Sequence, residues 1–204
     1  MAFLKKFLSA ISDSTKVEVP TVVFDQDWQD SIATLKSKFE GSKAPDSMNV
    51  SFPDELLHEL CDAIESHQPS SRIPYAEAKV PINNVGESFR QDGLAKLCGG
   101  KPGEEMDWLA GFLLPELLNP YDKNAVAVYA ISKEIPINSE DSPYAIAHVG
   151  YMDKESAAKV HKKILNLLGK NQYVPLLIRM TGGTADKPDY GAFPYAMTDA
   201  IKFP

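Results

Sequence analysis

The sequence has few of the residues from which enzymes and membrane proteins build recognisable features. Its 204 residues include two cysteines, Cys61 and Cys98, which lie far apart and form no CxxC pair. No stretch approaches eighteen consecutive apolar residues, and the chain does not open with an apolar run and a small-residue cleavage site. We therefore expect no membrane span and a reduced, cytoplasmic setting.

Motifs of catalysis and metal binding are also lacking. The sequence has no GxSxG, HExxH or GxxxxGK[ST], and "CGGKPG" (98–103) has the wrong spacing for a phosphate loop. His58, Cys61 and His67 lack a fourth zinc ligand, so we interpret them as a core cysteine flanked by surface histidines. His161 is expected to face solvent. The sequence thus predicts a protein that is not an enzyme and has no metal or cofactor.

Charge is distributed unevenly along the chain. The formal net charge of −7 argues against a protein that coats nucleic acid nonspecifically, because phosphate contacts need Lys and Arg. Residues 72–204 hold 15 basic and 16 acidic residues, whereas residues 1–71 hold 6 and 12. Five lysines from Lys154 to Lys170 form either a local basic patch or an ordinary solvated helix face.

The first third of the chain has the periodicity of helices. Apolar residues at helical spacing predict helices over 3–11, 28–39 and 52–67. The segment "QPSSRIP" (68–74) breaks this pattern, which suggests a helical N-terminal region (1–71) followed by a second domain (72–204). The acidic N-terminal region could bind a protein partner or mediate self-association.

The remainder alternates between strands and one prominent helix. The segments 75–86, 124–132, 144–152 and 173–181 predict strands, and 154–170 predicts an amphipathic helix. Several short strands with one helix indicate an α+β fold, a small β-barrel with a packed helix.

The segment "NPYDKNAVAV" (119–128) places a polar turn directly before an apolar strand. Asn119 and Asp122 can accept hydrogen bonds from nearby backbone N–H groups, which is enough to explain a hairpin connection. Tyr121, a large ring at the tip of such a turn, is not needed for the turn itself. A ring beside a carboxylate, a carboxamide and an ammonium is a suitable set of groups for holding a nucleotide.

Three segments in order, "GESFRQDG" (86–93), "ELLNPYDKNAVAVY" (116–129) and "AHVGYMDKESAAKV" (147–160), resemble the HIRAN domain family. The resemblance covers roughly residues 78–202. It implies an OB-like β-barrel that holds the 3′-hydroxyl end of single-stranded DNA in a surface pocket.

Carried over by residue, the resemblance assigns a role to each candidate. Tyr121 and Asn119 would contact the terminal backbone, and Asp122 would accept a hydrogen bond from the 3′-hydroxyl. The remaining candidates are Phe89 and Phe193 as stacking rings, Lys154 as a phosphate contact, and Arg90. Ser88 stands where the DNA-binding family members have an arginine, and Arg90 is near enough to substitute.

The leading hypothesis is therefore a module that captures single-stranded DNA 3′ ends without a motor or catalytic activity of its own. An alternative is a protein-interaction adaptor that uses residues 1–70, with the barrel as scaffold. A third possibility is a nuclease built from acidic residues such as Asp122, Asp153 and Glu155.

Overall fold

A computed structural model describes residues 17–18, 50–116, 119, 121–133 and 143–204. Helices expected over 3–11 and 28–39, and with them most of the N-terminal region expected to bind a partner, lie outside the described residues. The described part contains no helix with the length and apolar character needed to cross a membrane.

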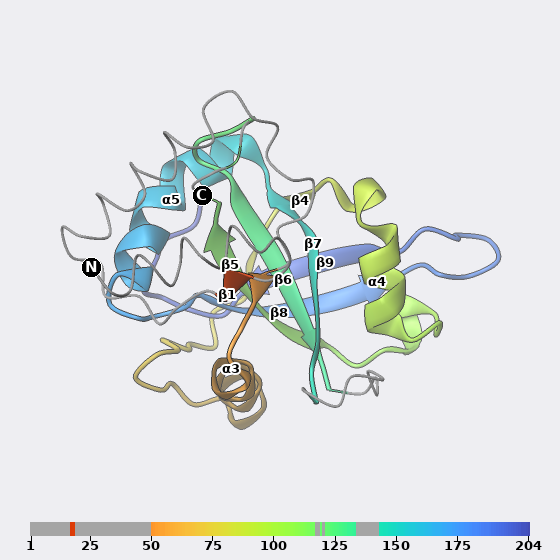
Figure 1. The fold of residues 1–204 in the computed structure, drawn as a ribbon, viewed down its shortest axis with the longest axis horizontal. Coiled ribbons are helices and arrows are strands. Elements are labelled where there is room, and N and C mark those ends of the chain that lie inside the picture. Colours follow the sequence, from red (N-terminus) through yellow and green to blue (C-terminus); the bar gives the residue numbers. More distant parts are fainter. Residues whose placement is uncertain (1–16, 19–49, 117–118, 120, 134–142) are drawn as a thin grey trace.

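A seven-stranded antiparallel sheet forms the centre of the fold (Figure 1). A separate parallel pair joins β1 (Val17–Glu18) to β2 (Val50–Ser51). The order across the large sheet is β3 (Val80–Pro81), β9 (Gly191–Ala196), β8 (Pro175–Thr181), β5 (Leu109–Pro115), β6 (Val126–Ser132), β7 (Ala145–Met152) and β4 (Asn84–Val85).

The sheet curls because one short segment, residues 80–85, pairs with strands near opposite edges of the sheet. Residues 80–81 pair with β9, and residues 84–85 pair with β7. Between and beside these strands, the Ile82 N–H donates to the Pro194 carbonyl at 2.9 Å and the Asp153 N–H donates to the Asn83 carbonyl at 2.9 Å. The result is an α+β fold with a curled half-barrel, which confirms the expected α+β class and is compatible with a small barrel.

In the part of the chain that the structure describes, three helices surround the sheet: α3 (Asp54–Ser66), α4 (Gln91–Cys98) and α5 (Lys154–Leu168). Two short 3-10 helices, η1 (Glu87–Phe89) and η2 (Gly103–Glu105), precede α4 and β5. In Figure 1, α3 lies below the sheet, α4 to the right and α5 at the upper left, and the connection from β8 to β9 projects beyond α4. The helices expected over 52–67 and 154–170 are thus confirmed, with slightly shorter bounds.

The core is built around Phe112 on the central strand β5. Its ring lies 4.8 Å from that of Phe52, 5.4 Å from that of Tyr129 and 6.0 Å from that of Tyr173. Helix α3 adds its apolar face to the same core and packs against β5 and β8. The division at residue 71 remains a prediction, and α3 on its N-terminal side shares the core of the sheet.

One expectation about α5 is wrong. His161 is buried, not exposed to solvent. It follows Ala157 by four residues and precedes Ile164 by three and Leu168 by seven, so it lies on the helix face that these buried residues form. By contrast, Cys61 is buried while His58 and His67 are exposed, as expected.

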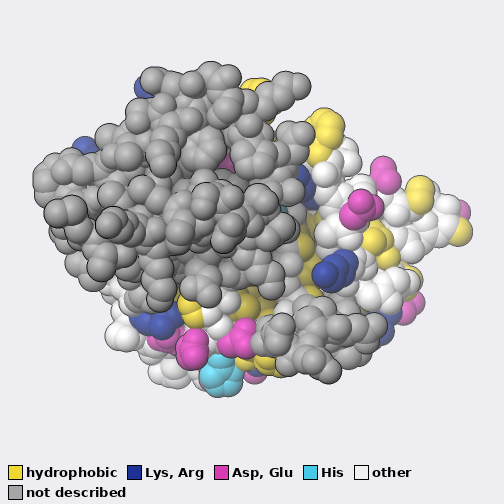
Figure 2. All heavy atoms as spheres, viewed as in Figure 1, with side chains coloured by type: hydrophobic (Ala, Val, Ile, Leu, Met, Phe, Trp, Pro, Cys, Tyr) yellow, Lys and Arg dark blue, Asp and Glu magenta, His cyan; other side chains and the backbone are white. Residues whose placement is uncertain are grey.

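The described surface is mixed in character. On the face drawn in Figure 2, hydrophobic side chains lie in separate small groups among charged ones on the right, where Figure 1 shows α4 and the β8–β9 connection. Acidic side chains and a histidine gather along the lower edge, over α3.

Candidate nucleic-acid interface

The "NPYD" turn connects β5 to β6 and is held by its own side chains. The Asn119 Oδ1 atom accepts hydrogen bonds from the backbone N–H groups of Tyr121 at 2.9 Å and Asp122 at 3.0 Å. The Asp122 Oδ1 atom accepts from the Asn124 N–H at 2.8 Å. Because these bonds fix the turn from within, the Tyr121 side chain is not needed for folding and is 90% exposed.

Glu116 ties this turn to the neighbouring strand β7. Its Oε2 atom accepts hydrogen bonds from the Asn119 Nδ2 amide and from the Tyr151 hydroxyl, each at 2.9 Å. One carboxylate oxygen therefore holds together the polar turn at the start of β6 and the residue near the end of β7. Both polar ends of the Asn119 side chain bond in or beside the turn, so Asn119 helps to position Tyr121 and Asp122.

A β-bulge in β7 brings two more side chains to the same place. Val128 pairs with Gly150 but Tyr129 pairs with His148, so Val149 is an extra residue on β7. The extra residue places His148 and Tyr151 on one face of the strand, although a regular strand would point them to opposite faces. Their rings meet edge to face at 4.5 Å, and His148 also stacks on Tyr129 at 5.2 Å.

Arg90 brings the first motif to this group. Its guanidinium carbon lies 5.8 Å from the centre of the Tyr151 ring, within the range of a cation–π contact. Gly86, at φ 82°, makes the turn into η1, and α4 begins directly after Arg90. Phe89, the residue before Arg90, is 84% exposed.

The electrostatics of the group follow from burial among aromatic rings. Burial, assisted by the nearby Arg90 cation, lowers the pKa of His148 to about 4, so its imidazole is neutral at pH 7. Its Nε2–H can then donate to the Gly150 carbonyl at 2.8 Å. Burial and the Glu116 carboxylate raise the pKa of Tyr151 to about 12, which keeps its hydroxyl protonated as the donor to Glu116.

The structure links Phe193 to the first motif and leaves Lys154 apart. Glu87 accepts a hydrogen bond from the Ala192 N–H, beside Phe193 on β9, at 2.6 Å. The Arg179 guanidinium lies 5.2 Å from the Phe193 ring, which is 44% exposed. Lys154 is the exposed first residue of α5, and within the described residues no hydrogen bond, ion pair or ring contact joins it to Glu116 or its partners.

Sequence reasoning missed three members of this site: Glu116, His148 and Tyr151. All three lie inside the segments of the resemblance, so position in those segments was the available signal. What was missing was the bulge, without which His148 and Tyr151 belong to opposite faces. The three segments, which are far apart in the chain, are joined by the contacts among Arg90, Tyr151, Glu116 and Asn119.

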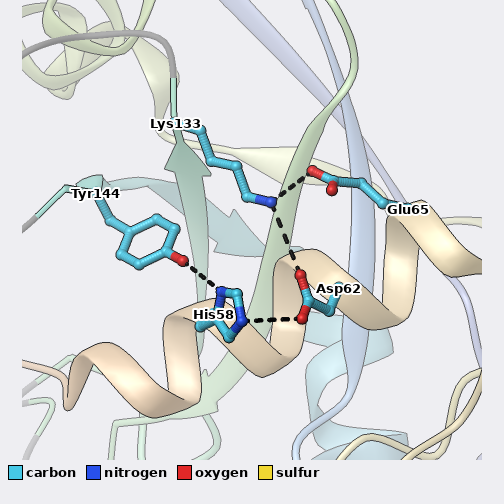
Figure 3. Close-up of polar contacts among 5 residues, drawn as sticks. All are labelled: His58, Asp62, Glu65, Lys133 and Tyr144. Carbon is cyan, nitrogen blue, oxygen red and sulfur yellow. Dashed lines mark hydrogen bonds and ion pairs between the residues drawn. The ribbon is translucent and has the colours of Figure 1, made fainter.

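A second polar cluster lies at the other ends of β6 and β7, against α3 (Figure 3). The Tyr144 hydroxyl lies 2.9 Å from His58 Nδ1, and His58 Nε2 lies 3.0 Å from the Asp62 carboxylate. Lys133 contacts Glu65 at 2.7 Å. A Tyr–His–Asp chain of this kind can activate a nucleophile, but burial raises the pKa of Tyr144, which works against ionisation. We interpret the cluster as a clasp between α3 and the sheet.

The described residues contain no group of three or more His, Cys, Asp or Glu side chains arranged to hold a metal ion. Comparisons with known protein families, with curated proteins and with solved structures find no match to this chain.

Proposed function

We propose that this protein captures the 3′-hydroxyl end of single-stranded DNA, as a HIRAN-like module with an OB-like barrel and no catalytic activity of its own. The observation that carries the proposal is the contact chain from Arg90 through Tyr151 and Glu116 to Asn119. It gathers the three segments of the resemblance into one surface.

The groups of this surface suit a strand end. Exposed rings such as Tyr121 and Phe89 can each support a base or sugar, and stacking contributes about 1–3 kcal/mol per base without sequence preference. Asp122 uses Oδ1 within the turn, so Oδ2 is the oxygen that would accept from a 3′-hydroxyl. A 3′-phosphate at that position would place two anions together, which is unfavourable by several kcal/mol without a counterion.

Fluorescence anisotropy on the full chain tests the proposal. The probes are a 5′-labelled single strand ending in 3′-hydroxyl, the same strand ending in 3′-phosphate, and a blunt duplex. The hydroxyl strand is expected to bind at least about tenfold more tightly than the other two. Equal affinity for the two single strands would contradict the end-reading mechanism.

Two pairs of variants separate recognition from folding of the turn. Tyr121→Ala should weaken binding about 5- to 150-fold, whereas Tyr121→Phe, which keeps the ring, should change it little. Asp122→Asn keeps an oxygen for the Asn124 N–H but removes the charge. It should bring the two single strands close to equal affinity, while Glu55→Ala on α3 removes a carboxylate elsewhere and should leave the preference intact.

A further inference from the structure

The outer face of the β8–β9 pair carries exposed aromatic rings that the fold does not require. Side chains alternate along these strands, with Ile178, Met180, Ala192 and Ala196 buried in the core. The alternate positions face outward, where Phe193 is 44% exposed and Tyr195 is half-buried. Trp108, just before β5, is also 44% exposed, and its ring lies 5.6 Å from that of Tyr195.

Cations accompany these rings. The Lys79 ammonium lies 5.0 Å from the centre of the Trp108 ring, and the Arg179 guanidinium lies 5.2 Å from that of Phe193. Arg179 and Phe193 are direct partners across the two strands, as are Leu177 and Tyr195. The rings and cations thus form one continuous surface, which we call the β8–β9 face: Lys79, Trp108, Leu177, Arg179, Phe193 and Tyr195.

The β8–β9 face carries positive charges, whereas the chain as a whole has a net charge of −7. Lys187 extends it, because its ammonium donates to the hydroxyl of Thr181, which faces outward at the end of β8, at 3.2 Å. Glu104 is a carboxylate beside it, and the Gly182 N–H donates to that carboxylate at 3.0 Å. The hydrogen bond from Gly182 is the main reason why the pKa of Glu104 is lowered, and the nearby Lys187 and Arg179 cations contribute to it.

We propose that the β8–β9 face binds single-stranded nucleic acid along its length, independently of sequence. Exposed rings supply stacking surfaces for bases, and Lys79, Arg179 and Lys187 supply contacts to phosphates. Phe193 and Tyr195 are two residues apart on one strand, so their positions repeat about every 6.6 Å and each ring offers its own face. An acidic peptide would satisfy the cations but would leave the rings without stacking partners.

This inference goes beyond the proposed end site, and it rests on the proposed function only where Phe193 belongs to both surfaces. The strand whose terminus lies at Tyr121 and Asp122 would continue over Phe193 toward Trp108. The end site would then determine which terminus is bound, and the β8–β9 face would make affinity increase with strand length.

The binding test uses a strand whose end cannot enter the proposed end site: a 5′-labelled oligothymidine of twelve nucleotides ending in 3′-phosphate. Trp108→Ala should weaken its binding to the full chain about 5- to 100-fold, and Arg179→Gln about two- to fivefold. Lys163→Gln, the matched loss of an exposed cation on α5, should have no effect. Tyr121→Ala should leave the affinity for this strand nearly unchanged. Unchanged affinity in both Trp108→Ala and Arg179→Gln would overturn the proposal.

A second readout does not depend on an alanine variant that folds poorly. The chain has two tryptophans, so Trp28→Phe leaves Trp108 as the only one. Stacking on a base should quench its fluorescence when the blocked strand is added, and polyglutamate of equal charge should neither quench it nor displace the strand. An unquenched Trp108, or full displacement by polyglutamate, would show that bases do not stack on this face.

The two proposals can fail separately. If Trp108→Ala leaves both the preference for 3′-hydroxyl and the affinity for the blocked strand unchanged, the proposal for the β8–β9 face alone is refuted. If the parent chain binds blocked and unblocked strands equally and Trp108→Ala abolishes this binding, the proposed end site is refuted and the β8–β9 face is supported.

Discussion

The neutral His148 makes stability depend on pH in a defined window. Its pKa falls from 6.5 in the unfolded chain to about 4 in the folded protein, because burial opposes the charged imidazolium. As pH falls below 6.5 the unfolded chain takes up a proton that the folded protein does not, so stability present above pH 6.5 is lost progressively down to about pH 4.

The size of this effect follows from linkage. Each unit of pKa difference corresponds to about 1.4 kcal/mol, which gives about 3 kcal/mol in full and about 2 kcal/mol between pH 7 and pH 5. Urea unfolding at pH 7, 6 and 5 measures it directly.

Comparison of variants isolates His148 from the other titrating groups. His148→Phe keeps a ring to pack on Tyr129 but cannot titrate, and it loses the bond to the Gly150 carbonyl at every pH. Its free energy of unfolding should therefore fall about 2 kcal/mol less than that of the parent between pH 7 and pH 5. His67→Asn, at an exposed position whose φ of 56° Asn tolerates, serves as the control and should follow the parent. Parallel curves for parent and His148→Phe would refute the argument.

Three further predictions concern the core. Phe112→Ala should lower the free energy of unfolding by about 3–5 kcal/mol in urea titrations, because Phe112 is fully buried among aromatic rings. Gly111→Ala should lower the free energy of unfolding by about 1–3 kcal/mol in the same measurement, since a Cβ there would lie 2.3 Å from the Tyr129 carbonyl oxygen. As a control, Gly93→Ala should lower it much less, because its Cβ would meet its nearest atom at 3.3 Å. Burial raises the pKa of both Cys61 and Cys98 to about 11, so at pH 8 a thiol reagent should label them only after unfolding; fast labelling of the folded chain would contradict their burial.

Periodicity predicted those elements of the fold that have one polar and one apolar face. The apolar residues of α3 and most of those of α5 lie on the faces that spacing indicates, and β6, β7 and β8 fall within the expected segments. Strand β5 was not predicted, because α3 and α5 both pack against it and its residues are almost all buried, which removes the alternation. Strand β9 was not predicted either, since Gly191 and Pro194 are atypical of a strand.

The candidate site likewise has one part that the sequence predicted and one part that it did not. Asn119, Tyr121 and Asp122 are neighbours in the chain, so turn chemistry alone predicted their local arrangement, which the hydrogen bonds of Asn119 bear out. The approach of Tyr151 and His148 depends on a one-residue bulge, of which Gly150 within the strand pattern is a sequence signal that does not give the new register. Their roles as contacts to DNA remain predictions.

The small number of cations near the β8–β9 face gives the salt dependence of binding a defined size. Single-stranded nucleic acid releases counterions with a slope of about −0.7 per phosphate contact in a plot of log affinity against log salt concentration. Lys79 and Arg179 on the β8–β9 face, with Lys187 beside it, would give a slope of about −2, so a rise from 50 to 200 mM salt should weaken binding only about 15-fold. Stacking on Trp108 and its neighbours does not release counterions and should persist at higher salt. A slope of about −4 or steeper would require more cations than this face offers, and the lysines of α5 would then be the better candidate for the path of the strand.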